Sequence, residues 1–322
     1  MSRAGGTGSI YRDRADEAMT ARAYERFAAE RRRATRRTRG SGARPNLIVI
    51  GGLKCGTTSL HHYLALHPDV AMSRPKELNF FVSELNWELG ADWYASHFDP
   101  GARVRGETSP HYTNRPRFEG VATRMRSLLD EARIVYVVRD PIDRLLSHYL
   151  HNLGGGYERR PLADALADER SAYWQRSRYA YQLESYVEAF GAERIAIVAG
   201  EELKRDRRAA MRNLFAFLEV DPEFSSPEFG REWETGAAKG SGGFKLMDRA
   251  VRLPGLRALD RNFDRLPERL RWAVERLVHD PGSGEGAKPE LPADLRARMV
   301  DVFGADTARL EEIAGREFGW LS

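Results

Sequence analysis

Short apolar runs alternate with amphipathic segments along most of this chain. Residues 47–50, 134–138 and 195–198 are apolar runs rich in valine and isoleucine, and residues 103–106 form a shorter, more polar strand candidate. Continuous β-branched runs are typical of strands that are buried on both faces, as in a parallel sheet. The pattern therefore predicts strands at these four places.

Apolar residues recur at helical spacing between these strands. The segment beyond Phe244 is also mainly helical in pattern, apart from a stretch rich in proline and glycine at 281–292. Strands that alternate with helices predict an α/β fold, in which helices flank a parallel sheet, with a mainly helical C-terminal part. We expect helices at 57–67, where Pro68 ends the helix, and at 141–153, 179–190 and 207–218.

A glycine-rich turn joins the first predicted strand to the helix after it. It reads Gly-Gly-Leu-Lys-Cys-Gly-Thr-Thr-Ser from Gly51 to Ser59. Glycines let backbone N–H groups approach an anion closely, and a helix N-terminus attracts negative charge. We expect the three hydroxyl residues to cap the helix and Lys54 to face a phosphate. The turn therefore predicts a phosphate-binding loop formed by Gly52, Lys54, Cys55, Gly56, Thr57, Thr58 and Ser59.

The position of the lysine bears on the kind of phosphate. In the loop of nucleotide triphosphatases, a lysine follows the last glycine and the next hydroxyl binds magnesium. Here Lys54 precedes Gly56, and no Gly-Lys-Ser/Thr follows. This order counts against a metal-dependent P-loop kinase that acts on a small molecule, which stays an alternative. A non-catalytic nucleotide-binding scaffold and an ordinary glycine-rich turn are further alternatives.

A second candidate phosphate site follows the strand predicted at 134–138. Arg139 comes at the carboxyl end of this strand, and Pro141 begins the next helix. Ser147 lies about two turns into that helix, so its side chain and that of Arg139 can face one phosphate. The alternative is that Arg139 and Asp140 only cap the helix and pair there.

Together these two segments resemble the donor site of sulfotransferases that use 3′-phosphoadenosine 5′-phosphosulfate (PAPS). The resemblance implies a P-loop-like nucleotide-binding core in which the glycine loop binds the 5′-phosphosulfate. It also implies that Arg139 and Ser147 bind the ribose 3′-phosphate. In the late segment 238–244, the resemblance implies that Lys239, Gly240 and Ser241 close over the same phosphate, and a surface loop with a stray lysine is the alternative.

A third segment, residues 73–81, reads Ser-Arg-Pro-Lys-Glu-Leu-Asn-Phe-Phe. It is similar to the segment of heparan-sulfate-type sulfotransferases in which a glutamate precedes a short run that ends in Phe-Phe. By position, the resemblance implies that Glu77 is the general base, which removes the proton of an acceptor hydroxyl as it attacks sulfur. The alternative is that Glu77 pairs with Lys76 or Arg74 on the surface.

The resemblance implies direct in-line transfer of the sulfuryl group from PAPS to an acceptor hydroxyl. Lys54 and the loop N–H groups then stabilise the charge on the departing 5′-phosphate, and 3′-phosphoadenosine 5′-phosphate (PAP) leaves. The scheme needs no metal, and the His, Cys and carboxylate residues show no spacing typical of metal ligands.

Two departures from the family pattern bear on the acceptor. Thr108 stands where some glycan-modifying relatives have a lysine, and Asn79 stands where some have a histidine. Polysaccharide specificity is therefore not implied, and a small molecule, a glycolipid or a short glycan is the expected acceptor. Whether Lys76, Thr108 or His111 assists catalysis stays open.

The charge is concentrated at the N-terminus. Residues 1–44 contain twelve arginines and five acidic residues, a net charge of +7, and the whole chain is +4, which leaves −3 for the remainder. We expect a flexible basic arm at 1–44 and a single sulfotransferase domain at 45–322. The arm has the composition of a solvated extension, although acidic lipid, nucleic acid or a partner protein are alternative contacts. We expect no nucleic-acid partner.

Cysteine usage and hydropathy bear on the location of the protein. The chain has 322 residues, 42% of them hydrophobic, and Cys55 is its sole cysteine, so an intramolecular disulfide is impossible. The position of Cys55 at a helix N-terminus beside Lys54 favours some thiolate character, but we do not expect Cys55 to act as a nucleophile. No apolar stretch is long enough to span a bilayer. We expect a cytoplasmic enzyme, and its oligomeric state stays open.

Overall fold

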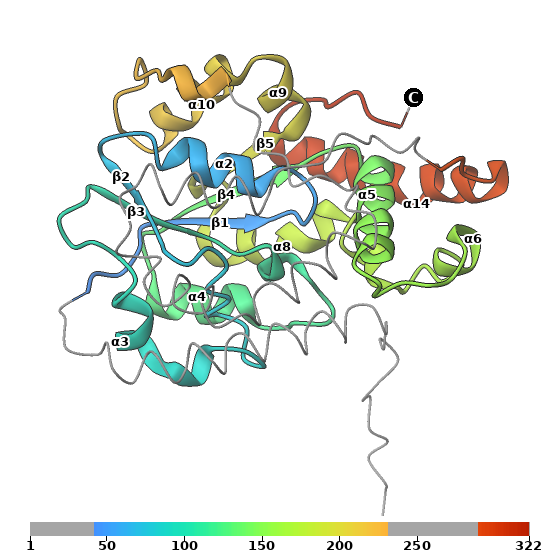
Figure 1. Cartoon of the computed structure of the whole chain (residues 1–322), viewed down its shortest axis with the longest axis horizontal. Coiled ribbons are helices and arrows are strands. Elements are labelled where there is room, and N and C mark those ends of the chain that lie inside the picture. The colour runs from blue at the N-terminus through green and yellow to red at the C-terminus, as the bar shows by residue number, and fades with distance from the viewer. Residues whose placement is uncertain (1–41, 231–288, 322) are drawn as a thin grey trace, which may run out of the picture.

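A five-stranded parallel sheet forms the core of the computed structural model, which describes residues 42–230 and 289–321. The strand order is β2-β3-β1-β4-β5, so β1 lies in the middle of the sheet (Figure 1). The α/β class predicted from the alternating pattern is confirmed. The strands are β1 (Leu47–Gly51), β2 (Val70–Met72), β3 (Val104–Thr108), β4 (Arg133–Val138) and β5 (Ile195–Ala199).

The register of β1 brings the ends of three strands together. Val49 lies opposite Thr108 of β3 on one side and opposite Val135 of β4 on the other. All five residues of β1 are buried, as are the last five of β4, because helices cover both faces of the sheet. The carboxyl ends of β1, β3 and β4 therefore meet at one edge, where open α/β sheets bind ligands.

Helices cover the two faces of the sheet. Figure 1 shows α2, α9 and α10 on one face and α4 and α8 on the other, while α5 stands at the carboxyl edge. The α-helices are α2 (Thr57–Leu64), α3 (Gly90–Ala95), α4 (Val121–Leu128), α5 (Pro141–Gly154), α6 (Leu162–Ala165), α7 (Ala172–Gln175), α8 (Tyr179–Phe190), α9 (Gly200–Arg205), α10 (Arg207–Phe217) and α14 (Ala293–Ala314). The short 3₁₀ helices are η1 (Trp87–Leu89), η2 (Pro110–Thr113), η3 (Ala192–Arg194) and η4 (Pro227–Gly230).

The buried apolar residues form a large cluster around the sheet and a second cluster beside α5. In the second cluster, Leu145 of α5, Trp174 of α7 and Phe303 of α14 are all buried. The rings of Trp174 and Phe303 lie 5.2 Å apart. The C-terminal helix α14 therefore packs against α7 in this cluster, and Asp306 of α14 accepts a hydrogen bond from the N–H of Ala180 in α8 at 2.9 Å.

Several observed elements differ from the predicted ones: β3 ends at Thr108 rather than at 106, and helices such as α4 were not predicted. Helix α2 ends at Leu64 rather than at 67, because the chain must leave the helical conformation before Pro68. The edge strand β2 was not predicted, since its three residues include only one buried side chain, Val70, and are too few to show a periodicity. Most of the predicted arm, residues 1–41, lies outside the described residues, as does the segment 238–244.

We predict that Phe303→Ala destabilises the fold without touching the carboxyl edge. Phe303 is fully buried, so its truncation should lower the free energy of unfolding by about 3–5 kcal/mol through lost burial and a cavity. Urea denaturation followed by circular dichroism measures this. The control Arg309→Ala removes an exposed ion pair with Glu312 and should cost less than about 1 kcal/mol. Equal losses in the two variants would contradict the packing role.

Candidate active site

The glycine loop joins β1 to α2 at the carboxyl edge and is fixed by backbone hydrogen bonds. The N–H of Gly52 donates to the carbonyl of Val137 in β4 at 2.5 Å, and the N–H of Cys55 donates to the carbonyl of Gly52 at 3.1 Å. Lys54 and Gly56 have φ values of 69° and 96°. A Cβ on Gly56 would meet nothing within 4 Å, so the left-handed backbone, and not space, favours glycine there.

Helix α2 begins directly after this loop without a capping side chain. Gly56 occupies the N-cap position, and the first turn contains no acidic residue. The expectation that Thr57, Thr58 and Ser59 cap the helix is therefore wrong, because these three residues follow the N-cap position and already belong to the helix. The start of α2 keeps the positive end of its dipole, which faces the loop.

Cys55 is a buried thiol and not a reactive one. Its side chain is only 3% exposed, and Sγ lies 3.5 Å from the hydroxyl of Tyr179. Burial raises the pKa of Cys55, although the Tyr179 hydrogen bond and the charges of Arg144 and Arg139 act in the opposite direction. The expectation of thiolate character is therefore wrong, because the thiol is buried and the cost of a charge there dominates.

Arg139 connects the glycine loop to α5. Its Nη1 donates to the carbonyl of Lys54 at 3.3 Å, and its Nη2 lies 3.1 Å from Oδ2 of Asp143. The predicted helix cap is present, since Oδ1 of Asp140 accepts from the N–H of Asp143 at 2.9 Å, but the pairing partner of Arg139 is Asp143 rather than Asp140. Ser147 lies one turn beyond Asp143 on α5 and is half-buried. The two candidate phosphate elements thus touch.

Glu77 reaches the same edge from the opposite side of β1. The N–H of Ser73 donates to the carbonyl of Gly106 at 2.7 Å, and the N–H of Glu77 donates to that of Thr108 at 3.0 Å. The segment 73–77 thus runs alongside the carboxyl end of β3. Oε1 of Glu77 lies 2.6 Å from Nζ of Lys76, and the carboxylate is 36% exposed. The pairing with Lys76 is therefore real, but it leaves Glu77 accessible at the edge.

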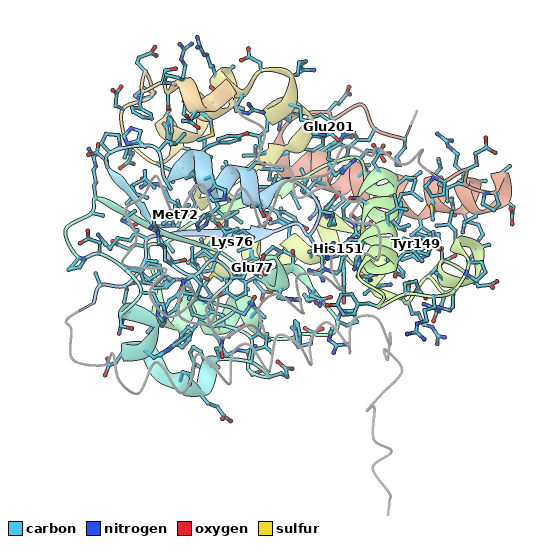
Figure 2. All side chains as sticks on the ribbon, viewed as in Figure 1. Met72, Lys76, Glu77, Tyr149, His151 and Glu201 are labelled. Atoms are coloured by element: carbon cyan, nitrogen blue, oxygen red, sulfur yellow. The ribbon has the colours of Figure 1, made fainter. Side chains whose placement is uncertain are left out.

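His151 is a residue of this edge that the sequence patterns do not single out. It lies in the last turn of α5, and Figure 2 shows it with Glu77 in the middle of the molecule. Burial and the charge of Lys54 lower the pKa of His151 to about 4, whereas Glu77 acts in the opposite direction. The imidazole is therefore neutral near pH 7. The sequence offered one signal for His151: it lies four residues after Ser147, and residues at this spacing share one face of a helix.

The remaining candidates divide into buried and accessible residues. Thr108 is fully buried, and its Oγ1 lies 3.0 Å from Nδ1 of His61. His111 is only 8% exposed. Lys76, in contrast, is 19% exposed and pairs with Glu77. Of the three residues whose part in catalysis the sequence leaves open, Lys76 is therefore the one that lies accessible at the edge. The predicted residues Lys239, Gly240 and Ser241 lie outside the described residues.

Comparison with known proteins assigns the family. A model of the sulfotransferase domain matches residues 44–232, which include the glycine loop, Glu77 and Arg139. This chain belongs to the sulfotransferase family. The sulfotransferase predicted from the sequence is thereby confirmed at the level of the family. The crystal structure of a sulfotransferase from Alicyclobacillus acidocaldarius is similar, with a TM-score of 0.59 and 25% identity over 86% of this chain and 98% of that one.

Curated relatives are larger proteins. The membrane-associated sulfotransferase kil1 of Dictyostelium discoideum is 39% identical over 110 residues, which are 33% of this chain and 22% of that protein. A bifunctional heparan sulfate N-deacetylase/N-sulfotransferase 1 of Caenorhabditis elegans is 27% identical over 72% of this chain and 28% of its own length. The sulfotransferase therefore spans less than a third of the length of these relatives.

The part of the chain that the structure describes has neither a membrane-spanning helix nor a metal-binding cluster. Between residues 42–230 and 289–321, no helix has the length and hydropathy needed to cross a bilayer. The same residues contain no cluster of three or more His, Cys, Asp or Glu side chains with the geometry to hold a metal ion.

We predict that His151 makes the sulfotransferase less stable as the pH falls. Its pKa is about 4 in the folded protein and about 6.5 in the unfolded chain, so between these values only the unfolded chain binds the proton. The free energy of unfolding should therefore decrease from about pH 7 to about pH 4. In His151→Asn this decrease should be smaller, although the pKa values of His61 and His148 are also lowered by burial and keep part of it. Urea denaturation at several pH values measures the slope, and identical slopes would contradict the prediction.

Proposed function

We propose that this sulfotransferase moves the sulfuryl group of PAPS to an acceptor hydroxyl at the carboxyl edge of β1. The observation that carries the proposal is the contact between its two candidate phosphate elements, in which Arg139 donates to the backbone of Lys54 at 3.3 Å. PAPS carries a phosphosulfate on its 5′-carbon and a phosphate on its 3′-carbon, so one ribose spans two neighbouring anion sites. The contact keeps two such sites side by side.

The chemistry of each element fits one end of the donor. The glycine loop and the uncapped start of α2 offer backbone N–H groups and a helix dipole to the 5′-phosphosulfate, with Lys54 as the cation. The guanidinium of Arg139, 22% exposed, and the half-buried Ser147 offer donors to the 3′-phosphate. The ion pair with Asp143 holds the guanidinium of Arg139 in place. The residues present therefore suit the donor.

In the proposed reaction, the acceptor oxygen attacks sulfur in line with the bond to the 5′-phosphate. The new O–S bond forms as the old one breaks, the acceptor proton passes to Glu77, and PAP leaves. Two observations support this role for Glu77. Its side chain is 36% exposed, and its backbone N–H donates to the carbonyl of Thr108. Lys54 and the loop N–H groups stabilise the charge that develops on the leaving phosphate.

We further propose a small molecule, a glycolipid or a short glycan as the acceptor. Outside residues 1–44 the net charge is −3, which offers no general attraction to a long polyanion. Thr108, in place of a lysine, is buried and contributes no cation to the edge. The names of the heparan sulfate relatives describe those proteins only. A cytoplasmic location stays a prediction, which rests on the single cysteine of the sequence.

We predict that PAP binds the protein without metal and that Arg139→Ala weakens this binding about tenfold to a hundredfold, because a charged hydrogen bond to phosphate is lost. Isothermal titration calorimetry with PAP, and with ATP plus magnesium, measures both affinities. The control Arg170→Ala removes an exposed arginine that pairs with Asp168 and should bind PAP like the wild type. Preference for ATP with magnesium would favour the kinase, and binding of neither nucleotide would overturn the donor site.

We predict that Glu77→Gln lowers the rate of sulfuryl transfer about a hundredfold or more, since the amide cannot accept the proton. Its affinity for PAP should stay within about twofold of the wild type, because Glu77 belongs to the segment beside β3, whereas the two phosphate elements follow β1 and β4. Transfer from radiolabelled PAPS to a phenol, a long-chain alcohol, a glycolipid and a disaccharide measures the rate. The control Glu84→Gln changes an exposed glutamate near by. Full transfer by Glu77→Gln would disprove the base assignment.

A further inference from the structure

A buried carboxylate lies behind the segment that carries Glu77. Glu107, at the end of β3, is 0% exposed. Its Oε1 accepts hydrogen bonds from the hydroxyls of Tyr94 at 2.5 Å and Tyr112 at 2.7 Å, and its Oε2 accepts one from Ser109 at 2.8 Å. In the described chain, these partners are all neutral hydroxyls. A carboxylate buried without a cation is costly, and these three hydrogen bonds offset part of that cost.

A chain of hydrogen bonds runs from Glu107 to Glu77. A serine hydroxyl has one hydrogen and two lone pairs, and the hydrogen of Ser109 points to Glu107. Its oxygen is therefore left to accept the N–H of Asn79, at 3.0 Å. The side-chain amide of Asn79 in turn donates to the carbonyl of Glu77 at 3.0 Å. Glu107 thus orients the Ser109 hydroxyl, the one group in this chain of hydrogen bonds that can donate or accept, so that its oxygen faces the N–H of Asn79.

These bonds hold Glu77 and Asn79 in a backbone conformation that residues with a side chain rarely adopt. Glu77 has a φ of 67° and Asn79 a φ of 49°, both in the left-handed region. Residues with a Cβ stay there only when their surroundings hold them. The bonds to Asn79, together with that from Glu77 to the carbonyl of Thr108, supply this restraint.

The tyrosines that bind Glu107 also hold the residues that follow Glu77. Phe80 stacks on Tyr94, with ring centres 4.3 Å apart and an angle of 8° between the planes. The hydroxyl of Tyr112 accepts the N–H of Phe81 at 3.5 Å. Both ends of the segment therefore depend on groups that Glu107 orients.

We propose that Glu107 is a positioning residue for Glu77, which it holds at the carboxyl edge through Ser109, Asn79 and the two tyrosines. This inference rests on the proposed function, in which Glu77 is the base. Glu107 itself does not touch the acceptor or the donor. Burial raises its pKa, whereas its hydrogen bonds to Tyr94, Tyr112 and Ser109 act in the opposite direction.

The test is a double-mutant cycle of Glu107→Gln and Glu77→Gln, measured with radiolabelled PAPS and the best acceptor of the four-compound panel. Glu107→Gln turns one acceptor into a donor, so the Ser109 hydroxyl or a tyrosine must turn away. We expect kcat to fall about tenfold to a hundredfold, because small displacements of a reacting group are costly. The KM for PAPS should change less than about twofold, since the donor elements belong to β1, β4 and α5.

The decisive comparison is the effect of the same change in the Glu77→Gln protein. When the base is absent, its position no longer matters, so Glu107→Gln should then lower kcat less than about threefold. An equal loss in both backgrounds, or a matching loss of PAPS affinity, would mean that Glu107 only stabilises the fold and would overturn the proposal. Full transfer by Glu77→Gln alone would instead overturn the base assignment and this inference together.

A milder pair of variants covers the case in which Glu107→Gln fails to fold. Tyr94→Phe removes one hydroxyl donor to Glu107 and keeps the ring that stacks on Phe80. The matched control is Tyr186→Phe, since this buried hydroxyl donates to the carbonyl of Tyr112 at 2.8 Å and does not contact Glu107. We expect Tyr94→Phe to lower kcat only when Glu77 is present, and Tyr186→Phe to change kcat little. Equal effects of the two variants would overturn the proposal.

Discussion

The parallel pairing of β1 with β3 and β4 is the constraint on which the site depends. Because β1 is central, its two neighbours end at the same edge, and each brings a different chemical group there. Beside β4 the loop is tied to the sheet by the bond from Gly52 to Val137, and beside β3 the N–H of Ser109 donates to the carbonyl of Val49. A change of register in either pair would separate Glu77, the proposed base, from the proposed donor site.

The edge combines cations that are already partly neutralised. Arg139 faces Asp143, and Lys76 faces Glu77, each within hydrogen-bond distance. Such pairs hold long side chains in place and leave other donors of each cation for a phosphate. Lys54 supplies a further cation, and burial together with this charge lowers the pKa of His151 and keeps it neutral near pH 7. The edge thus suits the proposed anionic donor without a large excess of positive charge on the rest of the protein.

The sequence predicted the parts of the site that lie next to strong local signals. Lys54 and Arg139 each follow a buried apolar run, so their place at the carboxyl edge comes from strand ends that periodicity locates well. The capping of α2 was predicted wrongly because a one-residue difference decides whether a hydroxyl residue caps a helix or belongs to it. The ionisation of Cys55 was predicted wrongly because the sequence shows a helix start but not burial.

The sequence by itself therefore determined the fold class, the family and the candidate residues, because these depend on patterns within a few residues of one another. Tertiary structure decided which residues meet. The contact of Arg139 with the Lys54 loop joins positions 85 residues apart, and the Glu107 network joins β3 to Asn79 and α3. No local pattern encodes such distances, since they arise only when the strands pair and the aromatic side chains pack behind them.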